Sequence, residues 1–184
     1  MTLIILPGIG GSGEAHWQTI WQSEGSQWVR FQPTSWDHPE LDDWAQALDE
    51  AIRQTDEPAI LIAHSLACLL VAHWAARSQL ARRVAGAFLV AVPDPDGPRF
   101  PLAEAGTFAD PPSVPLPFPT LILASSNDPY ASFKHAERRA FDWKAGIIDV
   151  GALGHVNSAS GLGAWLEGRR LLTAFRSGAH RSNG

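Results

Sequence analysis

The sequence predicts an α/β fold in which helices cover both faces of a doubly wound parallel sheet. Apolar runs of strand length recur along the 184 residues, and segments with helical spacing lie between them. The runs are apolar throughout, as is typical of parallel strands buried on both faces. We therefore predict a three-layer sandwich of about six parallel strands forming a single domain over residues 1–176, followed by a disordered polar tail at 177–184.

Six apolar runs are the predicted strands. In chain order they are TLIIL (2–6), WVRFQ (28–32), AILIA (59–63), GAFLVAV (86–92), TLILAS (120–125) and GIIDV (146–150). Right-handed crossover connections and the doubly wound arrangement predict the sheet order 2-1-3-4-5-6. The first and third strands then flank the point where the direction of winding reverses, which is where such sheets build their sites.

The connections between the runs differ in character. The segment HPELDDWAQALDEAIRQ (38–54) predicts an amphipathic helix, because its apolar residues recur at intervals of three and four. The residues on that apolar face are Leu41, Trp44, Ala45, Leu48, Ala51 and Ile52. Residues 93–119 hold nine of the 14 prolines, so we predict a long surface loop there rather than a crossover helix.

Composition narrows the possible partners. The net charge of −5 gives no basic footprint for nucleic acid or an anionic membrane surface. The one cysteine, Cys68, excludes a disulfide framework, and no apolar run reaches the length of a membrane span. We expect a soluble, cytoplasmic protein, a monomer or weak homo-oligomer, whose partner is a small-molecule ester-type substrate.

Ser65 lies between a predicted buried strand, PAILIA, and a predicted buried helix, LACLLVAHWAAR. A sharp strand-to-helix turn of this kind is a nucleophile elbow, which exposes a serine hydroxyl and needs small residues two positions to either side. Ala63 and Ala67 take the places of the two glycines in the usual G-x-S-x-G pattern. A serine that only caps the helix is the alternative interpretation of this stretch.

Possible partners of Ser65 follow the next strands of the sheet. Asp128 follows the run TLILAS, and His155 follows GIIDV in a glycine-rich loop. Serine, acid, histidine is the chain order of the catalytic triad in α/β-hydrolases. His155 would accept the Ser65 proton and Asp128 would orient the imidazole. Asp94 and Asp96, which follow the preceding strand, are the rival acids.

The first predicted strand ends in the glycine-rich loop LPGIGGSGEAHW, which lacks a complete nucleotide-binding pattern. In a hydrolase this loop supplies an oxyanion donor, here the N–H of Ile9, and the N–H of Leu66 supplies the other. No histidine has metal-type partners at suitable spacing, so we predict no metal and no cofactor. The residues predicted to line the pocket are Gly8, Gly10, His16, Trp17, His64, Phe100, Phe108 and Phe118.

Five ordered blocks extend over most of the chain: LPGIGGSGEAHWQTIWQ, WDHPELDDWAQALD, LIAHSLACLLVAHW, SSNDPYASFKHAE and GALGHVNSASGLGAWLEG. In these blocks the chain resembles the small serine hydrolases of the α/β-hydrolase superfamily typified by YdeN and retinoblastoma-binding protein nine. The resemblance implies a minimal α/β-hydrolase core without a cap domain, with Ser65, Asp128 and His155 as the triad. Ala67 stands where the family more often has glycine.

The function predicted from the sequence is hydrolysis of a small carboxylic ester, thioester or activated amide through an acyl-enzyme. The alternative is a binding or protein-interaction module on a hydrolase scaffold, as the name of the mammalian family member suggests, because a fold does not fix a function. The intact set of Ser65, Asp128 and His155 favours the enzyme.

Overall fold

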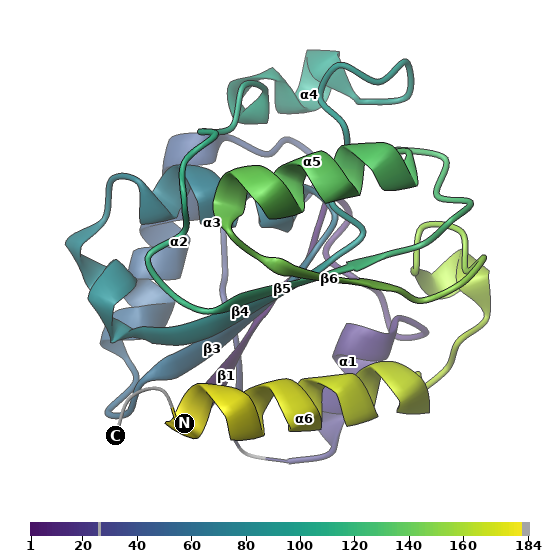
Figure 1. Ribbon diagram of the computed structural model, residues 1–184. Coiled ribbons are helices and arrows are strands. Elements are labelled where there is room, and N and C mark those ends of the chain that lie inside the picture. The colour runs from purple at the N-terminus through teal and green to yellow at the C-terminus, as the bar shows by residue number, and fades with distance from the viewer. Residues whose placement is uncertain (26, 182–184) are drawn as a thin grey trace.

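The computed structural model describes residues 1–25 and 27–181 and forms one six-stranded sheet (Figure 1). Its strands are β1 (Thr2–Leu6), β2 (Trp28–Arg30), β3 (Ala59–His64), β4 (Val84–Val90), β5 (Thr120–Ala124) and β6 (Gly146–Asp149). Neighbouring strands are parallel throughout, in the order β2-β1-β3-β4-β5-β6. The predicted fold class and strand order are therefore confirmed.

Helices cover both faces of the sheet (Figure 1). The α-helices are α1 (Trp17–Ser23), α2 (Leu41–Arg53), α3 (Leu66–Ala75), α4 (Leu102–Ala105), α5 (Phe133–Trp143) and α6 (Leu166–Arg181), and the 3-10 turns are η1 (Gln79–Arg83), η2 (Gly106–Phe108) and η3 (Ser158–Ser160). The helices α1 and α6 lie on one face, and α2, α3 and α5 lie on the other. Within the described residues, no helix is long and apolar enough to cross a bilayer.

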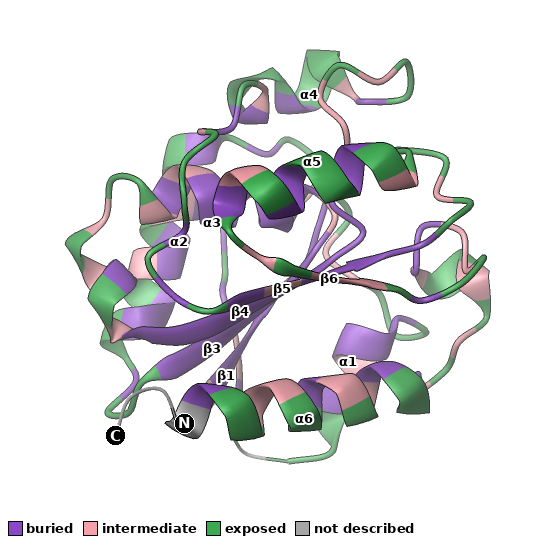
Figure 2. Cartoon of the chain, in the orientation of Figure 1, coloured by how far each residue is buried: buried purple, intermediate pink, exposed green. Residues whose placement is uncertain are grey.

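An apolar core lies on each face of the sheet, because successive strand residues point to opposite faces. In β1, Ile4 packs in the core beneath α2, α3 and α5, whereas Leu3 and Ile5 pack beneath α1 and α6. Figure 2 shows the central strands and most of α3 buried, whereas buried and exposed residues alternate along α2, α5 and α6. In α2 the predicted apolar face is correct except that Ala47 is buried where we expected Ala45, which is half-buried.

The proline-rich connection between β4 and β5 contains only the four-residue helix α4 and the turn η2. The expectation that it lacks a regular crossover helix is confirmed. It is more than a surface loop, however, because Phe100, Phe108 and Phe118 are buried in the core shared with α2, α3 and α5. Burial of these rings fixes the segment against the body of the protein.

The boundary predicted for the C-terminal tail, residues 177–184, is wrong because the last helix extends beyond residue 177. Helix α6 continues to Arg181, so residues 177–181 are helical, and only 182–184 lie outside the described residues. Leu172, Phe175 and Ala179 face the sheet at helical spacing, and Ala179 is buried. This contact outweighs the polar, glycine-containing composition that favoured a tail.

Candidate active site

Ser65 is the single residue between β3 and α3, at the carboxyl edge of the sheet. Its backbone angles are φ 54° and ψ −125°, a region that L-residues rarely adopt. Such backbone strain costs about 1–3 kcal/mol and persists only where surrounding contacts impose it. Here the Ser65 N–H donates to the Val90 carbonyl at 3.0 Å, and the Cys68 N–H donates to the Ser65 carbonyl at 2.8 Å. The positive φ expected for an elbow is present.

The elbow is crowded, which explains the small residues around it. A Cβ on Gly8 would lie 3.0 Å from the Ser65 Cβ and 3.2 Å from the His64 carbonyl oxygen. Ala63 and Ala67 are fully buried on either side of the turn. The turn forms with alanine at both positions, so glycine is needed at position 8 rather than at positions 63 and 67.

The structure brings Ser65, His155 and Asp128 together as one hydrogen-bonded chain. The Ser65 hydroxyl lies 2.8 Å from Nε2 of His155, and Nδ1 of His155 lies 2.9 Å from each carboxylate oxygen of Asp128. Because the carboxylate only accepts, the imidazole proton belongs on Nδ1, and Nε2 is left to accept from Ser65. The His155 and Asp128 side chains are 8% and 4% exposed, which shields this chain from water.

The loops that hold the acid and the histidine are tied to each other. The Asn127 Oδ1 accepts from the Gly154 N–H at 2.6 Å and from the Ser125 hydroxyl at 2.9 Å. That hydroxyl oxygen also accepts from the Leu153 N–H at 2.9 Å. The loop after β5 is thus hydrogen-bonded to the loop after β6 immediately before His155. These bonds fix the positions of Asp128 and His155 relative to each other.

The rival acids lie elsewhere. Asp94 pairs with Nδ1 of His135, the first-turn histidine of α5, at 3.2 Å, and accepts from the Asp96 N–H at 3.1 Å. Asp96 is exposed. Within the described residues, neither carboxylate contacts His155, and Asp94 serves to join the β4–β5 connection to α5.

Two backbone N–H groups beside Ser65 have no partner. Across the described part of the chain, the N–H groups of Ile9 and Leu66 donate to no protein acceptor, whereas those of Gly10 and Gly11 donate to Trp36 and Gly8 carbonyls. Leu66 is the first residue of α3, so its N–H lies at the positive end of the helix dipole. Both residues line the pocket that contains Ser65.

A pocket of about 580 Å³ opens over Ser65 and His155. Of the residues predicted to line it, Gly10, His16, His64 and Phe100 do so, whereas Gly8 does not, although it packs against Ser65. Trp17, Phe108 and Phe118 do not line it. They are buried in the two cores, because large apolar rings gain more from full burial than from facing a solvent-filled pocket.

Trp17 acts on the site indirectly. Its indole N–H donates to the Val156 carbonyl at 2.8 Å, directly after His155. His64, at the end of β3, bonds to the same loop: Nε2 of His64 donates to the His155 carbonyl at 2.9 Å. Two buried side chains from distant segments therefore fix the two successive carbonyls of His155 and Val156. The sequence pattern of the elbow treats position 64 as variable and gave no sign of this contact.

Three imidazole rings form a row beside the pocket. The centroids of His16 and His64 are 4.8 Å apart, and those of His64 and His155 are 5.0 Å apart. Nδ1 of His16 accepts from the Gln18 N–H and caps α1. Burial, with smaller contributions from the charges of Arg30 and His155, lowers the pKa of His16 to about 4. His16 is therefore neutral at pH 7.

Replacing His16 with asparagine should make the protein less sensitive to acid. The pKa of His16 is about 4 in the folded protein against 6.5 unfolded, so between these values the unfolded chain binds more protons and stability decreases as the pH is lowered. Between pH 8 and pH 5 this loss is about 2 kcal/mol. H16N keeps a capping oxygen but cannot titrate. Urea unfolding at both pH values measures the change, and an equal loss in both proteins would contradict it.

Sequence reasoning missed several pocket residues. Tyr130 lies two residues after Asp128, and its ring centroid is 4.4 Å from that of His155. Asn157 and Arg99 also line the pocket, on the loop after His155 and on the proline-rich connection. Tyr130 and Asn157 each lie two residues after a predicted triad member, Asp128 and His155, and this proximity in sequence could have indicated them. No comparable signal marked Arg99.

Several solved structures resemble this chain over nearly its whole length. A YdeN-like hydrolase from Pectobacterium atrosepticum is 34% identical, with a TM-score of 0.86 over 97% of this chain and 91% of its own. The YdeN gene product of B. subtilis is 21% identical, with a TM-score of 0.76 over 96% and 98%. The esterase domain of a Rhodothermus marinus protein is 18% identical, with a TM-score of 0.68 over 95% and 86%.

The last two likenesses show the fold alone. No curated protein matches the chain significantly. The family comparison extends over nearly the whole chain, from the first strand into α6. Residues 3–174 match the model of the serine hydrolase family, and the chain belongs to that family.

Proposed function

We propose that this hydrolase cleaves a small carboxylic ester, thioester or activated amide through an acyl-enzyme formed on Ser65. One observation carries the proposal: the continuous hydrogen-bonded chain from Asp128 through His155 to the Ser65 hydroxyl, at the floor of an open pocket. A serine hydroxyl is a weak nucleophile at neutral pH and needs an adjacent base, and His155 lies within proton-transfer distance.

In the acylation step, the Ser65 Oγ bonds to the carbonyl carbon of the substrate as its proton moves to Nε2 of His155. The carbonyl oxygen becomes an oxyanion, and the unpaired N–H groups of Ile9 and Leu66 would donate to it. Asp128 stabilises the imidazolium. The bond from carbon to the leaving group then breaks, and His155 returns the proton to that group.

Deacylation repeats the sequence with water as the nucleophile. His155 removes a proton from water, the hydroxyl adds to the acyl carbon, and the same N–H groups hold the second oxyanion. The bond to Ser65 breaks, Oγ recovers its proton from His155, and the carboxylic acid leaves. The ester bond and one water are converted into an acid and an alcohol, and the enzyme is regenerated.

Two further observations support a serine-based esterase. Cys68 does not compete as nucleophile, because burial raises the pKa of its thiol and the Sγ donates to the Val90 carbonyl at 3.4 Å. Solved structures of the same fold include the esterase domain from Rhodothermus marinus and a thermophilic esterase. Their likeness is in fold, and the triad geometry gives the argument for chemistry.

A fluorophosphonate probe tests the proposal. It should label Ser65, located by mass spectrometry of the tryptic peptides, and p-nitrophenyl esters of increasing acyl length should be hydrolysed. Labelling should disappear in His155→Ala, because the hydroxyl then lacks its base. A folded protein that neither reacts with the probe nor turns over any ester would favour the alternative, a binding module on a hydrolase scaffold.

A further inference from the structure

The lining of the pocket has an unusual charge composition. The chain has 19 acidic residues against 14 basic ones, yet no aspartate or glutamate is among the described residues that line the pocket. Among these described lining residues, Arg99 alone carries a permanent charge. An anionic group in this pocket therefore meets a cation and no fixed negative charge on its walls.

Arg99 is available for such a group. Within the described residues its guanidinium forms no hydrogen bond and no ion pair, and the residue is exposed. Six other described arginines donate to protein acceptors through their guanidinium groups: Arg30, Arg53, Arg77, Arg83, Arg139 and Arg169. A guanidinium presents a planar fork of donors that matches a carboxylate.

The backbone beneath Arg99 is fixed even though its side chain is free. The Gly97 N–H donates to the Asp94 carbonyl at 3.0 Å, and the Phe100 N–H donates to the Gly97 carbonyl at 3.1 Å. Phe100 is 8% exposed and also lines the pocket. Asp94 is in turn paired with His135, so it anchors the segment instead of neutralising Arg99.

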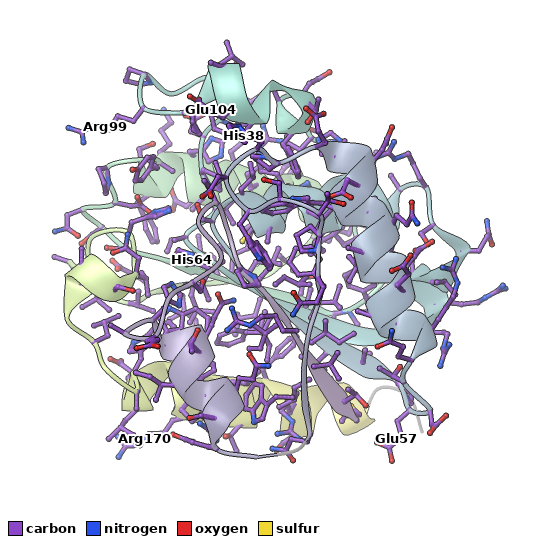
Figure 3. The ribbon with its side chains drawn as sticks, turned by 180° about the vertical axis from the view of Figure 1, so that it is seen from behind. His38, Glu57, His64, Arg99, Glu104 and Arg170 are labelled. Carbon is purple, nitrogen blue, oxygen red and sulfur yellow. The ribbon has the colours of Figure 1, made fainter. Side chains whose placement is uncertain are left out.

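The position of Arg99 decides where on a substrate the anion lies. Figure 3 shows His64, the neighbour of Ser65, in the middle of the molecule and Arg99 at its margin. Arg99 and Ser65 both line the pocket, but Arg99 is exposed whereas Ser65 is half-buried, so the cation lies nearer the solvent than the reacting carbon would. A substrate whose ester lies at Ser65 and whose anion reaches Arg99 must carry several bonds between the ester and the anionic group.

We propose that Arg99 is a specificity-determining residue and that the preferred substrates are esters with a carboxylate several atoms from the scissile bond, such as half-esters of dicarboxylic acids. This inference rests on the proposed esterase function and names its substrate class. Arg99 pairs with the carboxylate while the acyl chain lies along Phe100, Pro93 and Pro101.

Matched substrate pairs test the proposal. One member is a mono-p-nitrophenyl ester of a dicarboxylic acid from adipic to azelaic, chains too long for ready attack of the carboxylate on its own ester. The other is the same ester with the carboxylate replaced by a primary amide. The readout is the ratio of kcat/KM for the anionic ester to that for the neutral one. We expect a ratio above one that Arg99→Gln lowers about two- to fivefold, the range for exposed ion pairs.

Charge variants provide the controls. Arg99→Lys should retain part of the preference, and Arg99→Glu should lower the ratio below that of Arg99→Gln. Arg170→Gln makes the same change in net charge on exposed α6, far from Arg99 in Figure 3, and should leave the ratio unchanged. The inference is overturned if the wild type uses both esters equally, or if no substitution of Arg99 changes the ratio of kcat/KM values. Either result would leave the proposed esterase function in place. Absence of turnover for every ester contradicts the proposed function and the inference with it.

Discussion

Replacing Ser65 with alanine should lower ester hydrolysis by at least about 10⁴-fold, because the substitution removes the hydroxyl oxygen that we propose bonds to the substrate carbonyl. His155 would keep Asp128 as its partner but have no hydroxyl to deprotonate. The measurement is kcat/KM for a p-nitrophenyl ester, corrected for spontaneous hydrolysis. Thermal unfolding and far-ultraviolet circular dichroism should show the fold intact.

Ser177→Ala is the matched control, since it removes an exposed hydroxyl from α6 that, among the described residues, donates to the Thr173 carbonyl. It should hydrolyse the same ester at the wild-type rate. Alanine at position 65 has no Oγ, but it still has the Cβ that imposes strain at positive φ, so stability should change little. Turnover that persists in Ser65→Ala would mean that another residue is the nucleophile.

Replacing Asp128 with asparagine should lower kcat by about 10⁴-fold, the effect of the corresponding change in a serine protease. An amide can donate to Nδ1 of His155, which would place the imidazole proton on Nε2 and leave that nitrogen unable to accept from Ser65. The Asp128 Oδ1 also accepts from the Tyr130 N–H at 2.9 Å, a bond that an asparagine Oδ1 can retain. Loss of proton transfer lowers kcat, so kcat and KM should be measured separately.

Asp94→Asn and Asp96→Asn distinguish this assignment from its rivals. Asp96 is exposed and contacts no member of the triad, so its substitution should leave kcat unchanged. Asp94→Asn removes the charge that faces His135 and should act on stability more than on kcat. A 10⁴-fold loss in either variant, with activity retained in Asp128→Asn, would transfer the role of triad acid to the β4–β5 connection.

The parts of the fold predicted from sequence are those determined by local patterns. Apolar runs such as residues 2–6 and 59–63 match β1 and β3 to within one residue, because a strand buried on both faces must be apolar at every position. The position of Ser65 between two such elements left little room for any conformation but a sharp turn. Chain order and the common edge of a parallel sheet then brought Asp128 and His155 to it.

The rest depends on contacts between distant segments, which no local pattern encodes. The aromatic residues Trp17, Phe108 and Phe118 could face either a pocket or a core, and only the packing of whole helices decides between them. The same holds for His64, whose partner lies 91 residues away. The end of α6 was missed because burial of Ala179 against the sheet outweighs the composition of the segment.

The row of three imidazoles limits how much charge the site can hold. Burial, and then the proximity of His155 and His16, lowers the pKa of His64 well below 6.5. His64 and His16 would therefore remain uncharged in the proposed step in which His155 takes the proton from Ser65. In the proposed mechanism, the imidazolium formed on His155 would have Asp128 as its counterion, and the neighbouring described ring of His64 would carry no charge. A basic residue at position 16 or 64 would add a second positive charge to this space and oppose proton transfer in every catalytic cycle.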